Sequence, residues 1–485
     1  MSALQFPPGF LWGAATSSHQ IEGSPLERRE DVWDRFSRTP GAIADGTVAG
    51  DACDHLRLMT DDVALMAELG LHSYRFSISW ARVAGEGGWR ATSAGLDPYR
   101  RLVDLLGEAG ITASATLFHW DHPQELEELG GWRERDMAFR FAEYAADVAD
   151  ALAVGVASWA TLNEPWCVAF LGHADGEHAP GRQVPAEAAA VVHHLLLGHG
   201  LAVDALRAAG AASVGVVLNP APVLGDGSID ELTLRRIDGT LNRVWLDPLL
   251  LGRYPADVVE DLAAFAAPGL PIRDGDEALI ARPIDWLGVN YYNDHRFTLD
   301  APDEVGDLVA TVHRPTPHIT APEARPAHWD GEVTGQRWPI TPDGFERLLV
   351  RLGDDYGTAL PPLYITENGA AYDDPIVDGV CHDERRIHYL DAHLRAMRRA
   401  IVAGVDVRGY YAWSLFDNFE WAWGFAQRFG LVHVDFETKV RTPRSSAWWY
   451  SDICRTNLLG PAPASPSEAT SSRGVSRPDG GSSTA

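Results

Sequence analysis

The sequence has almost no lysine: of its 40 basic residues, 39 are arginine and one, Lys439, is lysine. A P-loop lysine for phosphate binding is therefore missing, and Schiff-base chemistry could use only Lys439. Positive charge is scarce overall, because 68 acidic residues outnumber the 40 basic ones and give a net charge of -28. This balance argues against binding to nucleic acid or to an anionic membrane and favours a neutral, small-molecule partner.

Cysteines and long apolar runs are also scarce. The four cysteines, Cys53, Cys167, Cys381 and Cys454, lie far apart and form no C-x-x-C pair. This predicts neither a disulfide framework nor a thiolate zinc site, but free thiols in a reducing compartment. No run approaches the roughly 18 consecutive apolar residues of a membrane span. Residues 1–8 show no basic cluster followed by an apolar stretch, so we expect a cytoplasmic protein.

The length of 485 residues fits about three domains of average size, or one α/β barrel with long loops. No linker or internal repeat divides residues 1–458, which we therefore interpret as one domain. Residues 459–485 are rich in proline, serine and glycine and lack apolar periodicity. That composition predicts a disordered tail, because it cannot offset the entropy of ordering.

Eight short apolar runs alternate with longer stretches of helical periodicity, which is the pattern of βα units around a parallel sheet. The runs are Phe10–Ala15, Tyr74–Ser79, Ile111–Phe118, Ala157–Leu162, Val214–Leu218, Ile284–Val289, Leu363–Thr366 and Arg408–Trp413. They predict an α/β fold, a single (β/α)8 TIM barrel with long βα loops. Among the helices, Thr60–Gly70 has Thr60 as its expected N-cap and Gly70 as its stop.

Polar side chains lie at or just after the ends of these runs, where barrel enzymes place their chemistry. They are Gln20, Arg75, His119, Asn163, Glu164, Asn219, Asn290, Tyr292, Glu367 and Trp413. Together they predict a ring of hydrogen-bonding groups around one cavity. For Asn219 alone, capping of the next helix is the more ordinary interpretation.

Glu164 and Glu367 end the fourth and seventh predicted strands, so they are expected to face each other across the barrel mouth. Two opposed carboxyl groups suggest glycoside hydrolysis, in which one carboxyl donates a proton and the other opposes the developing positive charge. Arg75, expected deep in the cavity, would lower the pKa of whichever glutamate it contacts. Burial and the charge of that first glutamate would raise the pKa of the other.

Several longer motifs carry a resemblance to a known family. They are Phe10–Thr16 with Gln20–Gly23, Tyr74–Trp80, His119–Asp121, Thr161–Pro165, Ile365–Gly369 and Trp413–Trp421. With these motifs in this order, the chain from about Phe6 to Trp449 resembles glycoside hydrolase family 1, the retaining β-glucosidases and β-galactosidases. The resemblance implies hydrolysis of small-molecule β-glycosides without a metal or another cofactor.

The same resemblance implies roles for individual residues. Glu164 would be the acid/base, and Glu367 the nucleophile that forms a covalent glycosyl-enzyme. Arg75 and Tyr292 would orient Glu367 and hold it ionised. The implied substrate-binding residues are Gln20, His119, Asn163, Asn290, Tyr292, Trp413, Glu420 and Trp421. Among these, Asn163 would bind the 2-hydroxyl, Trp413 would stack beneath the sugar, and a charged Glu420 would accept from two adjacent hydroxyls.

Within the family, the 6-phospho-β-glycosidases are the alternative. They carry a serine near position 420 together with a lysine and a tyrosine for the phosphate, whereas Glu420 in this chain would repel a phosphate. Two positions depart from the usual family pattern, with His19 in place of tyrosine and His122 in place of leucine. These two differences leave the choice among similar sugars open, but they do not affect the predicted reaction.

Three other functions are consistent with parts of the sequence. A non-catalytic sugar-binding barrel would have lost one of the two glutamates, and both are present. A transglycosylase would use the same covalent intermediate, so the sequence leaves it open. His193, His194 and His199 have spacings that do not suit a metal site on one helix face. We therefore expect a β-glucosidase with some β-galactosidase or β-fucosidase activity, acting on cellobiose, other oligosaccharides or aryl glycosides.

Overall fold

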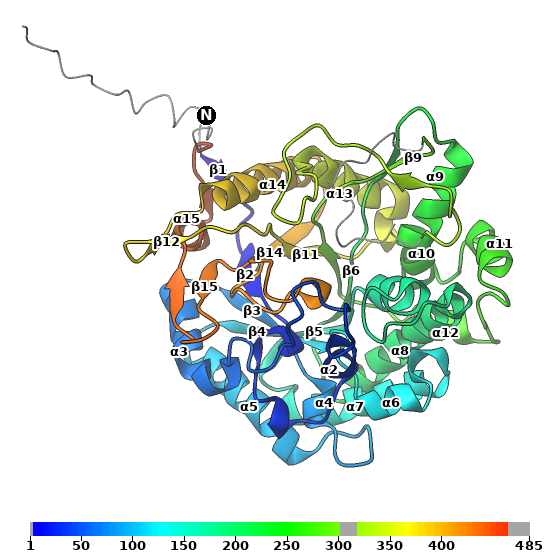
Figure 1. The fold of residues 1–485 in the computed structure, drawn as a ribbon, viewed down its shortest axis with the longest axis horizontal. Coiled ribbons are helices and arrows are strands. Elements are labelled where there is room, and N and C mark those ends of the chain that lie inside the picture. The colour runs from blue at the N-terminus through cyan, green and yellow to red at the C-terminus, as the bar shows by residue number, and fades with distance from the viewer. Residues whose placement is uncertain (1–2, 301–317, 464–485) are drawn as a thin grey trace, which may run out of the picture.

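A computed structural model describes residues 3–300 and 318–463 (Figure 1). Eight parallel strands close into a barrel in the order β11-β14-β2-β3-β4-β5-β6-β8, which confirms the predicted architecture. The barrel strands are β2 (Leu11–Ala15), β3 (Ser73–Ser77), β4 (Thr112–Phe118), β5 (Val156–Asn163), β6 (Val214–Leu218), β8 (Trp286–Asn290), β11 (Leu363–Asn368) and β14 (Val407–Trp413). Each predicted run overlaps one of these strands.

Helices form an outer ring around the barrel (Figure 1). The longer ones are α3 (His55–Glu68), α5 (Ser93–Glu108), α7 (Asp136–Leu152), α8 (Ala188–Ala208), α9 (Glu231–Asp238), α10 (Val244–Leu251), α11 (Ala256–Phe265), α13 (Pro342–Tyr356), α14 (Glu384–Val402) and α15 (Ser445–Thr456). Shorter helices are α1 (Ser18–Ile21), α2 (Val32–Ser37), α4 (Trp80–Val83), α6 (Gln124–Glu128), α12 (Asp276–Ile280), the π-helix η3 (Cys167–Asp175) and the 3-10 helix η7 (Trp421–Trp423).

Short strands in the loops complete the fold. They are β7 (Val223–Gly225), β9 (His295–Thr298) and β10 (Arg325–Pro326) in one sheet, the pair β12 (Ile376–Val377) and β13 (Val380–Cys381), and the pair β15 (Val432–Val434) and β16 (Arg441–Pro443). These strands lie in the βα loops, which are the part of a barrel that carries its chemistry.

The barrel strands are buried because helices cover their outer face and side chains fill the inner one. Every residue of β3, β6 and β8 is buried. Close strand contact also requires glycine at position 13 in β2. A Cβ atom there would lie 2.6 Å from the carbonyl oxygen of Ser73 and 2.6 Å from the ring of Tyr411.

Helix α3 begins five residues earlier than the predicted segment Thr60–Gly70. Its buried face includes the polar residues His55 and Asp62, whose side chains hydrogen-bond to each other at 2.8 Å. Because these buried positions are polar, the repeat of apolar residues that marks a helix is not visible in the sequence there. The prediction therefore began the helix too late. The N-cap assignment of Thr60 is therefore wrong. Gly70 has a left-handed φ of 70° just after the helix, as its predicted role requires.

One helical segment, Pro185–Ala208, is long and apolar enough to cross a membrane. It includes α8, and 78% of its most apolar stretch is buried inside the protein. A helix that is apolar on nearly all sides is expected to be buried in this way, here against α7 and α12.

The two ends of the described chain meet in a small antiparallel sheet. β1 (Leu4–Gln5) pairs with β17 (Leu458–Leu459), with Leu4 opposite Leu459. Leu459 is buried, so the folded domain includes this residue, which is the first residue of the predicted tail. Residues 464–485, which make up most of the predicted tail, lie outside the described residues.

Candidate active site

The parallel strands bring the residues predicted at their ends to one end of the barrel. Five of them lie within barrel strands: Arg75, Asn163, Asn290, Glu367 and Trp413. Three come just after strands: His119, Glu164 and Tyr292. Gln20 lies in α1, and Glu420 and Trp421 lie in the segment after β14. All of these side chains are buried except Tyr292, which is half-buried. Hydrogen bonds and ring contacts connect them, as described below.

Glu367 is the glutamate that Arg75 contacts. The Arg75 guanidinium donates to Oε1 of Glu367 at 2.7 Å, and the hydroxyl of Tyr292 donates to Oε2 at 2.8 Å. Burial raises the pKa of Glu367, and the Arg75 cation and the Tyr292 hydroxyl lower it without fully offsetting burial. A cation and a hydroxyl, one on each oxygen, stabilise the ionised form of Glu367. An ionised carboxylate is what a nucleophile requires.

Glu164 has neutral hydrogen-bond donors instead. The side-chain amide of Asn290 donates to Oε1 at 2.5 Å, and the thiol of Cys167 donates to Oε2 at 3.1 Å. Burial and the negative charge of Glu367 raise the pKa of Glu164 to about 7. Glu164 therefore holds its proton up to about pH 7, whereas Arg75 and Tyr292 favour the ionised form of Glu367. These are the two carboxyl states that glycoside hydrolysis needs.

Two asparagines connect these glutamates to the rest of the site. Asn163 Oδ1 accepts from Arg75 at 2.6 Å and from the amide of Asn290 at 3.2 Å. The Asn163 amide in turn donates to Nε2 of His119 at 3.1 Å. Burial and the Arg75 charge hold the pKa of His119 well below its usual value, so His119 is neutral. The network fixes the orientation of each amide.

Glu420 differs from the sequence-based expectation of a charged carboxylate. Its Oε2 lies 3.5 Å from the side-chain amide of Gln20, which also donates to the Phe419 carbonyl at 2.9 Å. Burial and the charges of Glu367 and Glu164 raise the pKa of Glu420 to about 8. Sugar hydroxyls that donate to Glu420 would favour its ionised form. We therefore expect bound sugar, more than the empty cavity, to keep this carboxyl charged.

Aromatic rings form one wall of the site. The ring of His119 stacks with that of Trp413 at a centroid distance of 5.9 Å and with that of Trp421 at 5.8 Å, with interplanar angles of 19° and 20°. Trp120 also contacts Trp421, with ring centroids 4.6 Å apart. Flat aromatic surfaces of this kind suit the apolar face of a sugar.

Three residues at the site have a left-handed backbone although they are not glycine. The φ angles are 80° for Trp120, 41° for Glu164 and 46° for Trp421. Such a conformation costs on the order of 1–3 kcal/mol per residue and occurs preferentially at functional sites. All three residues are buried, so the surrounding packing maintains this backbone.

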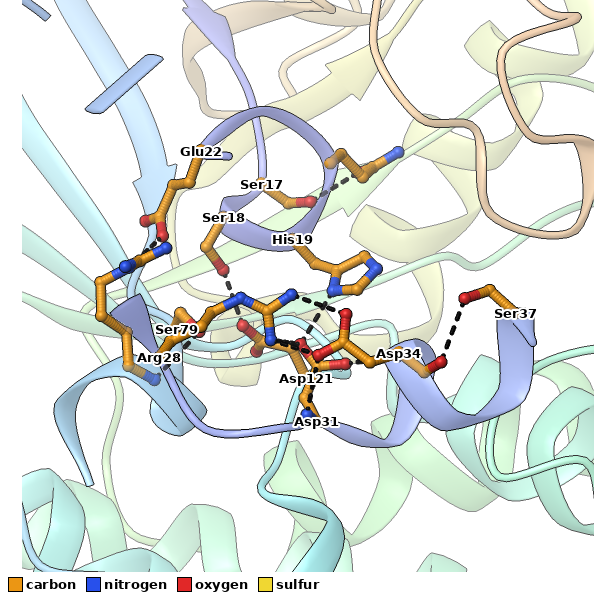
Figure 2. Close-up of polar contacts among 12 residues, drawn as sticks. Ser17, Ser18, His19, Glu22, Arg28, Asp31, Asp34, Ser37, Ser79 and Asp121 are labelled. Carbon is orange, nitrogen blue, oxygen red and sulfur yellow. Dashed lines mark hydrogen bonds and ion pairs between the residues drawn. The ribbon is translucent and has the colours of Figure 1, made fainter. Parts of the chain in front are cut away.

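His19, Arg28, Asp31 and Asp34 form a polar cluster (Figure 2) that contacts the site through the ring of Trp421. His19 bonds to Asp31 at 2.8 Å, and its ring stacks on Trp421 with centroids 5.9 Å apart and an angle of 12°. The ligand atoms of His19, Asp31 and Asp34 are close enough for a metal ion. However, the Arg28 guanidinium donates to Asp31 at 2.8 Å and to Asp34 at 2.5 and 2.8 Å. Arg28 therefore supplies the positive charge that these two carboxylates require.

The histidines of residues 193–199 point to separate partners. His193, His194 and His199 hydrogen-bond respectively to Asp276 at 2.8 Å, the Trp132 carbonyl at 2.9 Å and Thr161 at 2.6 Å. His122, the other departure from the family pattern, lies 3.3 Å from a carboxyl oxygen of Glu127. These contacts tie neighbouring elements together.

Two further residues, Trp120 and Cys167, contact the site although their sequence context predicts no role for them. The indole N–H of Trp120 donates to the Asn163 carbonyl at 2.8 Å, and the thiol of Cys167 contacts Glu164. The signal for Cys167 was its position three residues after Glu164, just beyond a strand end. Asn219 was expected to cap a helix, but its amide lies 3.8 Å from the sulfur of Cys167.

A TIM barrel with a charge-stabilised carboxylate and a second, protonated carboxyl at its C-terminal end has the features of a glycoside hydrolase. Comparison with known protein families also identifies a glycoside hydrolase. The model of the family described as Glycosyl hydrolase family 1 matches residues 2–459. The chain belongs to glycosyl hydrolase family 1, which confirms the resemblance seen in the sequence.

Individual relatives match over nearly the whole chain. Thermostable beta-glucosidase B of Thermobispora bispora is 47% identical over 94% of this chain and 92% of its own length. The bifunctional beta-D-glucosidase/beta-D-fucosidase of Bifidobacterium breve is 42% identical over 92% of this chain and 97% of its own. The crystal structure of the psychrophilic β-glucosidase of Micrococcus antarcticus superposes with a TM-score of 0.90 at 45% identity, covering 94% of this chain and 98% of that one.

Proposed function

We propose that this protein is a retaining β-glucosidase that releases terminal, non-reducing β-D-glucosyl residues and also acts on β-galactosides and β-fucosides. The observation that carries this proposal is the unequal environment of two buried glutamates. Arg75 and Tyr292 contact Glu367, whereas neutral donors contact Glu164. The relatives are named β-glucosidases, which supports glucose as the sugar that is released. The bifunctional enzyme of Bifidobacterium breve supports activity on β-fucosides as well.

In the first half of the reaction, the carboxylate of Glu367 attacks the anomeric carbon. Glu164 gives its proton to the glycosidic oxygen, and the bond to the leaving group breaks. The resulting ester no longer carries the negative charge of Glu367, which had raised the pKa of Glu164. The pKa of Glu164 then falls, so Glu164 can take a proton from the attacking water in the second half. Two inversions give net retention.

A panel of substrates tests the proposed function. We expect the purified protein to release the aryl group from aryl β-glucoside, β-galactoside and β-fucoside. A 6-phosphorylated β-glucoside should be left almost untouched, because Glu420, once ionised against the bound sugar, would repel the phosphate. Values of kcat/KM for cellobiose, laminaribiose and lactose show which linkage and which sugar the protein prefers. Product analysis at high sugar concentration distinguishes hydrolysis from transglycosylation. Absence of release from all three aryl glycosides would exclude the proposal.

The pH dependence of kcat/KM follows from the two carboxyl states. Activity requires Glu367 ionised and Glu164 protonated, so the profile is expected to be bell-shaped. Glu164 loses its proton as the pH rises through its pKa of about 7, and kcat/KM should decline on that side. Glu367 gains a proton on the acidic side, which removes the nucleophile. A profile that stayed flat from pH 6 to 9 would contradict this assignment.

Glu420 is proposed to accept hydrogen bonds from the 4- and 6-hydroxyls. Glu420→Gln should lower kcat/KM for aryl β-glucoside by about 10- to 150-fold, since each hydrogen bond to a charged group contributes about 1.5–3 kcal/mol. The loss should be smaller for β-fucoside, which lacks the 6-hydroxyl. Kinetics on both substrates provide the comparison, and equal losses on the two sugars would argue against a contact with the 6-hydroxyl.

We further propose a cytoplasmic role in the breakdown of cellobiose or other oligosaccharides, including those derived from cellulose. All four cysteines are buried free thiols, which supports a reducing compartment. Fractionation of producing cells, with activity measured in each fraction, tests the location. Activity recovered mainly outside the cytoplasmic fraction would contradict it.

A further inference from the structure

The thiol of Cys167 is held against the carboxyl group of Glu164 by the local backbone. The backbone N–H of Cys167 donates to the Glu164 carbonyl at 3.0 Å, which closes a tight turn through Pro165. This turn brings the two side chains to the same side, where Sγ donates to Oε2 at 3.1 Å. The side chains are almost fully buried, with 5% of Cys167 and 7% of Glu164 exposed. The contact is therefore built into the strand end.

Cys167 remains a neutral donor in this position. Burial and the nearby charges of Glu164 and Glu367 raise the pKa of the thiol well above its usual value, so the thiol keeps its proton. From the other side, the amide of Asn219 donates to the sulfur at 3.8 Å. Asn219 follows β6, so a chain of hydrogen bonds runs from that strand end through Cys167 to Glu164.

We propose that Cys167 is a positioning residue for Glu164: its thiol orients the carboxyl group and stabilises the ionised form that appears when Glu164 gives up its proton. This inference rests on the proposed function of Glu164 as acid/base. The proton passes from Glu164 to the glycosidic oxygen, and a proton from water later returns to Glu164. The thiol keeps its own proton throughout.

Two matched variants of Cys167 separate hydrogen bonding from packing. Cys167→Val fills similar space without a donor, and Cys167→Ser retains a donor. Since the thiol is a weak donor to a charged group, its loss should move the basic limb of the kcat/KM profile upward by about 0.5 to 1 pH unit. Cys167→Ser should stay within about 0.3 unit of the unmodified protein or move below it. Asn219→Ala should give a smaller upward shift.

The leaving group provides a second measurement on the same variants. With Cys167→Val, kcat/KM should fall about 3- to 10-fold for cellobiose, whose leaving group needs protonation. It should change less than 2-fold for 2,4-dinitrophenyl β-glucoside, whose leaving group does not. If Cys167→Val fails to fold, as judged by circular dichroism, Cys167→Ala takes its place with the same expected shift.

Two results would overturn the inference. One is a basic limb of the valine or alanine variant that coincides with that of the unmodified protein. The other is an equal loss on both substrates with an unshifted limb, which would show that Cys167 acts only through packing. Failure of the proposed function is distinguishable, because the unmodified protein would then release nothing from aryl β-glycosides.

Discussion

Replacing Glu367 by alanine is expected to lower kcat/KM for aryl β-glucosides by at least about 10⁴-fold, because the glycosyl-enzyme can no longer form. The change also leaves Arg75 buried without the carboxylate it contacts at 2.7 Å, so part of the loss could come from instability. Glu367→Gln is the matched control, because it keeps an acceptor for Arg75 but remains a poor nucleophile. Thermal unfolding and steady-state kinetics of both variants separate the two effects.

Added azide identifies the role of Glu367 independently of its contribution to stability. Azide should enter the space left in Glu367→Ala and attack an activated β-glucoside from the face opposite the leaving group. That single inversion gives an α-glucosyl azide, which nuclear magnetic resonance distinguishes from the β anomer. Formation of the β-azide would mean that the roles of Glu164 and Glu367 are exchanged.

Glu164→Ala is expected to have an effect that depends on the leaving group. For cellobiose, kcat/KM should fall by about 10²- to 10⁴-fold, the usual contribution of general acid catalysis. For 2,4-dinitrophenyl β-glucoside, formation of the glycosyl-enzyme should be nearly unchanged, and its slow hydrolysis should let the intermediate accumulate. Pre-steady-state kinetics would detect this as a burst of dinitrophenol.

The same variant gives the complementary azide product. Azide should attack the accumulated glycosyl-enzyme from the face that Glu164 normally serves and yield a β-glucosyl azide. Equal losses on cellobiose and on the dinitrophenyl substrate would contradict the assignment of Glu164 as the proton donor. Together, the two alanine variants test both carboxyl roles with one nucleophile.

The barrel could be predicted because its signal is local. Each strand is a short apolar run, and each helix has its own period, so the eight units are visible without knowledge of their contacts. The first turn of α3 was missed where this signal failed, since His55 and Asp62 are polar yet buried against each other. Their hydrogen bond joins two polar residues two turns apart on the buried face of one helix, and hydropathy does not reveal that such residues are buried.

In the candidate site, too, some features could be predicted from the sequence and others could not. Motifs around Glu164 and Glu367 singled out the two carboxyl groups, because a glutamate at the end of an apolar strand is unusual enough to stand out. The contact of Cys167 with Glu164 was not predicted, since it depends on the turn geometry and on a left-handed φ of 41° at Glu164. The raised pKa of Glu420, to about 8, arises from burial with two other glutamates.

By itself, the sequence determined the barrel, the family and the identity of the two glutamates, because local periodicity and short motifs encode them. The family resemblance implied that Arg75 contacts Glu367, but only the tertiary structure showed this contact, the neutral donors around Glu164 and the rise of the Glu164 pKa to about 7. The reason is physical: a pKa depends on burial and on charges brought close by folding. Glu164 and Glu367 are far apart along the chain, and only the closed barrel brings them into one cavity.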